Sequence, residues 1–173
     1  MTTTSNLFKI VLLLLLVSCY QPEAKVAEQE ILVDSRGWFR GYNLGKNVEE
    51  ILQKEPWKPT ISNDSVVEFR QSLVYNQDSI EIDLYLSFDQ LGLFEIQADF
   101  WMDNSLQFEH MMANFSDKLS LTFGDFKTSG EEMIWTTNSN ANRIIEITLS
   151  QEITDGDVQF LSLNYLEPLN DKY

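Results

Sequence analysis

This sequence has few kinds of side chain that could perform chemistry: one cysteine, Cys19, one histidine, His110, and 27 aspartates and glutamates. A single thiol forms no disulfide within the chain and no cysteine-based metal site. A hydrolytic triad needs a nucleophile beside its base, and nothing in the sequence places one beside His110. Neither Asp103-Asn104 nor Asp155-Gly156-Asp157 has the spacing of a calcium loop. We therefore predict no catalytic residue, no metal site and no cofactor.

The one thiol follows a short apolar segment near the N-terminus. Lys9 precedes the run Ile10–Val17, which has the length of a signal-peptide core and is much shorter than the roughly 20 apolar residues that span a membrane. The run Leu16-Val17-Ser18-Cys19 resembles the lipobox of bacterial lipoproteins. This resemblance implies cleavage between Ser18 and Cys19, a diacylglyceryl group on the Cys19 thiol, and often an acyl chain such as palmitate on the new amine.

A lipid group of this kind would hold the protein at a membrane, because two or three acyl chains exceed the single chain that gives only marginal binding. Residues 1–18 are then a signal peptide, and residues 19–36, which begin polar and contain Pro22, are predicted to be a flexible tether. Residues 37–173 are long enough for one domain. We expect a location in the cell envelope, either on the periplasmic face of the inner or outer membrane or on the cell surface.

The net charge of the sequence narrows the choice of partners. The full chain carries −15, and Lys9 is the only charged residue among residues 1–18, so cleavage changes the charge by one unit, to −16. Such a surface repels nucleic-acid phosphates and anionic lipid head groups, which excludes nucleic acid as a partner. An acidic surface favours solubility, and it can also attract a basic partner.

Two helices are predicted from their caps and from the spacing of apolar residues. Asn47 is a candidate N-cap with Glu50 three residues later, and Pro56 ends this short helix. Asn104 and Gly124 are candidate caps of a second helix over residues 105–123. Apolar residues recur in it at steps of three and four, as in a helix that packs on a core: Phe108, Met111, Met112, Phe115, Leu119 and Phe123.

Alternation of apolar and polar residues predicts the strands. Ile80–Phe88 alternates well, and after a turn Phe94, Ile96, Ala98 and Phe100 share one face, which indicates a hairpin. A strand is expected over residues 66–75, where β-branched and aromatic residues are frequent although the alternation is imperfect. Further strands are expected over residues 132–137, 145–149 and 158–165. We predict an α+β fold in which helices pack on one face of an antiparallel sheet, with two tandem helix-plus-three-strand units over residues 37–102 and 103–173.

The order of elements suggests a further resemblance. Phe39–Leu52, with Gly41 and Gly45 ahead of a helix and antiparallel strands after it, looks like the small outer-membrane-assembly lipoprotein fold. A doubled helix-plus-sheet unit is similar to β-lactamase-inhibitor-like proteins. The chain departs from the assembly family in having Lys54-Glu55-Pro56 where that family has Gly-x-Pro. Proteins of both kinds act by binding other proteins, so the resemblance implies a binding role without catalytic residues.

Three functions are compatible with these patterns. The first is a non-catalytic module that binds another envelope or secreted protein, with Trp101 and Tyr85 as candidate partner-binding residues, because both fall on the polar faces of their strands. Aromatic residues there could instead form a second apolar layer against loops. The second function is a small-ligand binder with a pocket between helix 105–123 and the sheet. The third is a carboxylate-based hydrolase with two acids facing each other in a cleft.

Overall fold

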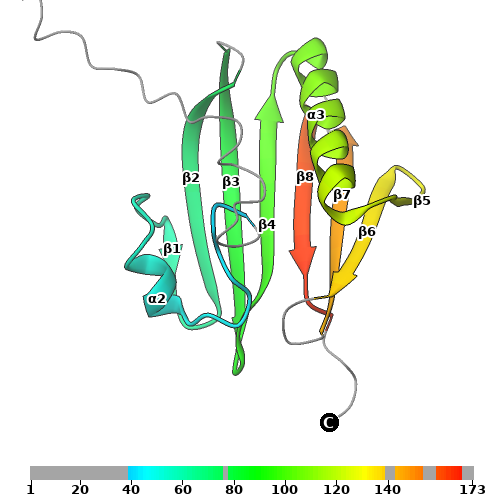
Figure 1. Ribbon diagram of the computed structural model, residues 1–173. Helices are drawn as coiled ribbons and strands as arrows, with labels where there is room; N and C mark the ends of the chain where they lie inside the picture. Colours follow the sequence, from blue (N-terminus) through cyan, green and yellow to red (C-terminus); the bar gives the residue numbers. More distant parts are fainter. Residues whose placement is uncertain (1–38, 76–77, 139–142, 154–158, 169–173) are drawn as a thin grey trace, which may run out of the picture.

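Eight strands form one antiparallel sheet in the computed structural model of the chain (Figure 1), which describes residues 39–75, 78–138, 143–153 and 159–168. Two helices are described, α2 (Val48–Leu52) and α3 (Ser105–Phe123). The strands are β1 (Ile61–Ser62), β2 (Val66–Tyr75), β3 (Asp78–Asp89), β4 (Gly92–Met102), β5 (Lys127–Ser129), β6 (Glu132–Asn138), β7 (Ile144–Ile153) and β8 (Gln159–Leu166). Their order across the sheet is β1-β2-β3-β4-β8-β7-β6-β5, so β4 and β8 are central neighbours.

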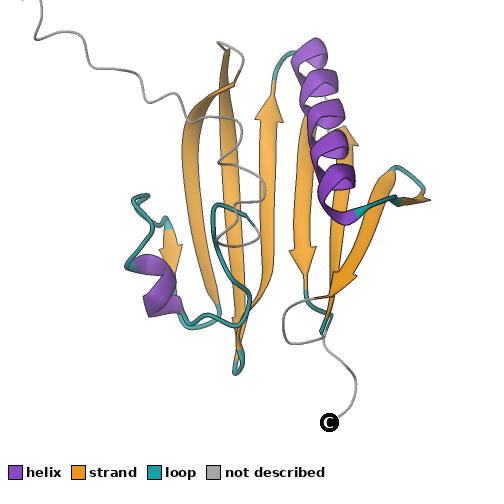
Figure 2. Ribbon diagram, in the orientation of Figure 1, coloured by secondary structure: helices purple, strands orange, loops and turns teal. Residues whose placement is uncertain are grey.

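One face of the sheet carries the core, and we call it the covered face. The buried side chains that point to it from β3, β4, β7 and β8 are mostly isoleucine, leucine and phenylalanine. α3 lies across this face (Figure 2), where the Phe115 ring meets the Phe100 ring of β4 edge to face at 5.2 Å. The indole Nε1 of Trp135 in β6 donates to Ser120 Oγ at 3.3 Å. The apolar stripe of α3 therefore belongs to the core.

The β2–β4 half of the covered face is closed by the segment 39–57. Phe39 is fully buried, and its ring lies 6.5 Å from that of Phe100. The Trp57 ring lies 6.4 Å from that of Phe69 in β2. Both pairs meet edge to face, which is a favourable arrangement for aromatic rings.

A buried carboxylate ties this segment together. Glu55, whose side chain is 3% exposed, accepts hydrogen bonds from Arg40 Nη2 at 3.1 Å, from the backbone N–H of Trp57 at 3.0 Å and from the hydroxyl of Tyr42. The Arg40 guanidinium also lies 3.7 Å from the centre of the Trp57 ring. Burial, followed by the charge of Glu55, raises the pKa of Tyr42 well above its usual value, so its hydroxyl stays protonated as a donor.

Gly92, at the start of β4, permits the close approach of two backbone segments. Its φ is +109°, and an added Cβ would lie 2.6 Å from the carbonyl carbon and oxygen of Gly45. The next residue, Leu93, donates to Lys46 O at 2.8 Å and accepts from Gly45 N–H at 2.7 Å. Only glycine combines this dihedral angle with this contact, so the hairpin between β3 and β4 is fitted to the segment that precedes α2.

The predicted helix caps are confirmed. The Asn47 side chain accepts from the Glu50 N–H at 2.9 Å. Asn104 Oδ1 accepts from the backbone N–H of Leu106 at 3.0 Å, and α3 ends at Gly124, where φ is +86°. These side chains satisfy backbone donors that a helix start leaves without an intrahelical partner.

The predicted fold class is wrong. The α+β prediction, with helices packed on one face of an antiparallel sheet in helix-plus-three-strand units, gives way to a β-dominated fold, since one continuous eight-stranded sheet makes up most of the described chain and α2 has only five residues. Two strands were not predicted, β1 with two residues and β5 with three. All five residues are exposed, so neither strand leaves an alternating pattern in the sequence.

A second correction concerns the start of β4. The sequence places Phe94 on the apolar face, but Leu93 is the buried residue, with 1% exposed, and Phe94 is half-buried. The register explains the difference, because Phe88 pairs with Leu93 whereas Ser87 pairs with Glu95, which leaves Phe94 as the extra residue of a bulge. Beyond the bulge, Ile96, Ala98 and Phe100 lie on the covered face as the alternation predicts.

Candidate functional site

The opposite face of the sheet, which we call the open face, is polar and acidic. Neighbouring strands align their outward side chains in rows across it, and one such row runs from Arg70 through Asp83 and Asp99 to Ser162. Arg70 is the only basic residue in β2, β3, β4, β7 and β8. The acidic residues of these strands on the open face are Glu68, Glu81, Asp83, Asp89, Glu95, Asp99, Glu146 and Glu152.

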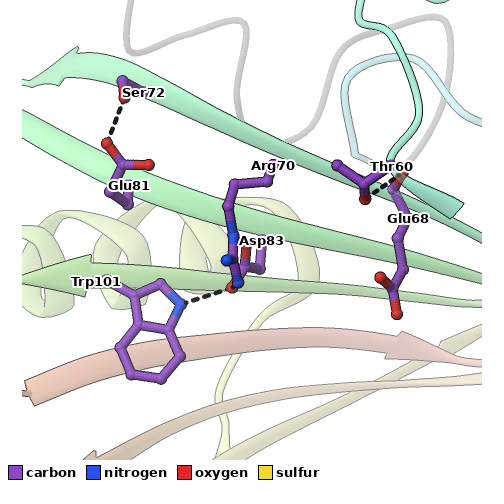
Figure 3. A network of polar contacts seen from close by, with 7 residues as sticks. All are labelled: Thr60, Glu68, Arg70, Ser72, Glu81, Asp83 and Trp101. Atoms are coloured by element: carbon purple, nitrogen blue, oxygen red, sulfur yellow. Dashed lines mark hydrogen bonds and ion pairs between the residues drawn. The ribbon is translucent and has the colours of Figure 1, made fainter.

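Arg70 and Asp83 form an ion pair across β2 and β3. Arg70 Nε donates to Asp83 Oδ1 at 2.5 Å and Nη2 donates to Oδ2 at 2.6 Å (Figure 3). Trp101 Nε1 donates to Asp83 Oδ2 at 3.1 Å. The Asp83 side chain is 7% exposed and that of Arg70 is 66% exposed. Hydrogen bonding to Asp83 raises the pKa of Arg70 above its usual value, and this bidentate pairing fixes the orientation of both groups.

The structure places both predicted partner-binding residues, Trp101 and Tyr85, on the open face, and both are half-buried. They lie at different levels of the sheet, because Trp101 is opposite Glu81 whereas Tyr85 is opposite Gln97. Trp101 has an aromatic neighbour that the sequence did not suggest, Phe160 of β8, at 4.5 Å between ring centres. Trp101 is therefore held between the Asp83 carboxylate and the Phe160 ring.

Asp99 is a buried carboxylate that forms no ion pair with another residue that the structure describes. Asp99 Oδ1 accepts from Ser162 Oγ at 2.7 Å, and the Gln97 side chain donates to both of its oxygens at 3.1 Å. The residue is 7% exposed and is the direct cross-strand neighbour of Asp83. Burial, and to a lesser extent the charge of Asp83, raises the pKa of Asp99, while the hydrogen bonds from Ser162 and Gln97 oppose the shift.

Replacement of Asp99 by asparagine is expected to increase the free energy of unfolding near pH 7. The asparagine oxygen keeps the acceptor for Ser162, and Gln97 can turn its own amide oxygen toward the new Nδ2–H, so the hydrogen bonds are retained. A carboxyl with a raised pKa binds its proton more tightly in the folded chain, so its contribution to stability is lost as the pH rises through that pKa. Urea unfolding of both proteins measures the difference, which should decrease when the pH is lowered to about 4. Glu132→Gln, an exposed change in β6, should alter stability little at either pH. A less stable Asp99→Asn variant near pH 7 would contradict the prediction.

A pocket of about 220 Å³ lies beside this network on the open face. Its lining comes from the end of the segment that leads into β1 and from three strands: Thr60, Ile61, Glu68, Phe69, Arg70, Asp83 and Tyr85. Figure 3 shows the Glu68 carboxylate lying apart from the Arg70–Asp83 pair. This pocket is not at the place that the sequence suggested, between helix 105–123 and the sheet. On that side of α3 the side chains of Met111, Phe115 and Leu119 are buried.

The other residues that the sequence analysis considered for catalysis or metal binding do not form a site among the described residues. His110 is exposed on α3, and Asn104 is occupied as its N-cap. Asp155-Gly156-Asp157, Ser18 and Cys19 lie outside the described residues. Among the residues that the structure describes, no three histidine, cysteine or acidic side chains gather as a metal site would require, and no helix is long and apolar enough to cross a membrane.

The sequence did not single out Asp83, Asp99, Arg70 or Phe160. Each sits in a strand that the alternation predicts, but their assembly depends on which residues face each other across strands. The bulge at Phe94 decides this, because it shifts the register by one residue and so brings Asp83 opposite Asp99. One signal in the sequence could have shown the bulge. With a two-residue turn, Ile82 and Leu84 lie on the same face as Ile96 and Ala98 only if one strand contains one extra residue.

No protein-family model matches the chain, and comparisons with curated proteins and with solved structures gave no match.

Proposed function

We propose that this protein is a lipid-anchored module of the cell envelope that binds another envelope or secreted protein through the open face of its sheet. The observation that carries the proposal is the Trp101–Phe160 pair, two half-buried rings in contact on a sheet face where neither α2 nor α3 packs. Aromatic side chains that are rigid before binding lose little entropy when a partner covers them, and tryptophan is frequent among residues that dominate binding energy.

The charge of the open face supports a basic partner. Its acidic rows contain a single basic residue, Arg70, and the guanidinium of that residue is already bound by Asp83. A positively charged surface would approach such a face faster than a neutral one, and an acidic surface would be repelled. The proposed partner is therefore a protein with a basic patch.

The pocket supports a protein partner more than a free small ligand. Its volume of about 220 Å³ is below the range of roughly 300–1,000 Å³ that is typical of small-molecule sites. The hydrolase alternative would need two acids facing each other across a cleft. Asp83 and Asp99 are neighbours on one sheet face, and hydrogen-bond donors already hold both carboxylates.

Substitution of Trp101 by alanine is expected to weaken partner binding by at least about tenfold, because it removes the larger ring of the Trp101–Phe160 pair. The full-length acylated protein would be cross-linked in its native membrane, and a captured basic protein would be purified and titrated against native and variant protein. Leu121→Ala is the matched control, since Leu121 is 88% exposed on α3, away from the open face. Equal affinity of native protein and Trp101→Ala, or capture of acidic neighbours only, would refute the proposal.

A further inference from the structure

The pocket on the open face contains one acidic group that no described side chain neutralises. The carboxylate of Glu68 has no hydrogen bond or ion pair with the described residues, although the backbone oxygen of Glu68 accepts from Thr60 N–H at 2.8 Å. The other two charges of the lining, Arg70 and Asp83, bind each other. The lining as a whole therefore carries one net negative charge, which is located at Glu68.

The neighbours of Glu68 suit a cation on an aliphatic stem. Tyr85 is directly opposite Glu68 on β3, and Ile61 is directly opposite it on β1. The phenol ring of Tyr85 can face a cation, and Ile61, which is 46% exposed, can cover methylene groups. Burial, followed by the charges of Asp83, Asp99 and Glu68, raises the pKa of Tyr85, so this hydroxyl is a neutral donor at physiological pH.

We infer that this pocket receives one basic side chain, an arginine or a lysine, from the partner that docks on the open face. The inference rests on the proposed function and adds the chemistry of one contact: the guanidinium or ammonium group pairs with the Glu68 carboxylate beside the Tyr85 ring. An anion is disfavoured by the net charge of the lining. A metal ion would find a single free carboxylate, whereas cations such as calcium take six to eight oxygen ligands.

Capped single residues test the pocket without knowledge of the partner. Full-length native protein in detergent would be titrated with N-acetyl-argininamide, N-acetyl-lysinamide and the neutral isostere N-acetyl-citrullinamide, and followed by nuclear magnetic resonance. We expect a dissociation constant on the order of 1–10 mM for at least one of the two cationic probes, and binding at least about fivefold weaker for the citrulline probe. Binding of the cationic probes should weaken as salt is raised from about 50 to 300 mM.

Two variants locate the effect. Glu68→Gln keeps the shape of the side chain and should reduce affinity for the cationic probes to that of the citrulline probe. Ser72→Ala, four residues further along β2, where the hydroxyl binds Glu81, is the matched control and should leave the affinity unchanged. Equal binding of the arginine and citrulline probes, or full binding of the cationic probes by Glu68→Gln, would overturn the inference.

The outcomes separate this inference from the proposed function. The pocket assignment is wrong, while the docking face stands, if the cationic probes do not bind to native protein and Glu68→Gln captures the protein partner as well as native protein does. If the cationic probes bind through Glu68 but Trp101→Ala leaves partner capture unchanged, the subsite is supported and the docking role of the aromatic pair is rejected.

Discussion

Replacement of Cys19 by alanine is expected to remove the protein from the membrane fraction or to leave its precursor uncut. The expectation follows from the lipobox-like residues Leu16-Val17-Ser18-Cys19, because the thiol of Cys19 is the proposed site of the lipid. Without acyl chains, the chain that remains would have no strong attachment, since each buried methylene contributes about 0.8 kcal/mol to membrane binding. Fractionation, together with labelling by a radioactive fatty acid, measures both effects.

A matched control uses a residue of the proposed tether. Ser35→Ala should leave labelling and membrane association unchanged, because it keeps the thiol and the lipobox-like residues. Unchanged acyl labelling of Cys19→Ala, or an intact N-terminus with a free thiol in the mass spectrum of native protein, would refute the lipid anchor. Binding measured in detergent should persist in a folded Cys19→Ala chain, because the substitution changes no residue of the open face.

Substitution of Glu55 by glutamine is expected to reduce the free energy of unfolding by about 3 kcal/mol or more, as is usual when one partner of a buried ion pair is removed. The Arg40 and Glu55 side chains are 15% and 3% exposed, so the remaining guanidinium would lose its counter-ion where little water can replace it. The amide of glutamine would also present donor hydrogens to groups that donate to Glu55, namely Tyr42 and the backbone N–H of Trp57.

An exposed ion pair in the same segment gives the control. Lys46 Nζ lies 2.7 Å from Glu50 Oε2, and their side chains are 44% and 43% exposed. Glu50→Gln should therefore change the free energy of unfolding by less than about 1 kcal/mol, because solvent screens exposed pairs. Urea denaturation of the two variants measures the contrast, and similar losses of stability would show that burial of the Glu55 cluster has no special weight.

Local patterns in the sequence predicted the helices and the long strands well. Asn47 and Asn104 are side chains that cap helices through their own hydrogen bonds, so a short stretch of residues contains the whole signal. The clearest of the long strands, β3 and β4, alternate in polarity, and this also depends only on neighbouring residues. The polar-face positions of Tyr85 and Trp101 follow from the same alternation.

The sequence did not predict features that depend on distant segments. The fold class was wrong because the edge strands β1 and β5 are short and exposed, and because nothing local indicates that β4 pairs with β8. The neighbourhood of Trp101 depends on that pairing, since Phe160 approaches it from β8. In the sequence, Glu55 is an ordinary polar residue before a proline. Its contacts with Arg40, Tyr42 and Trp57 form only in the folded chain.

The β4–β8 ladder has a consequence for how the protein reaches its native state. Every other ladder of the sheet joins strands that follow each other in the chain, whereas Asn164 of β8 bonds to Glu95 of β4 across a separation of 69 residues. Pairing of β4 with β8 closes the longest loop of the sheet and therefore has the largest cost in chain entropy. The hairpins on either side close short loops and can form earlier. Trp101 and Phe160 lie on opposite sides of this seam, so a partially folded chain would not present the aromatic pair.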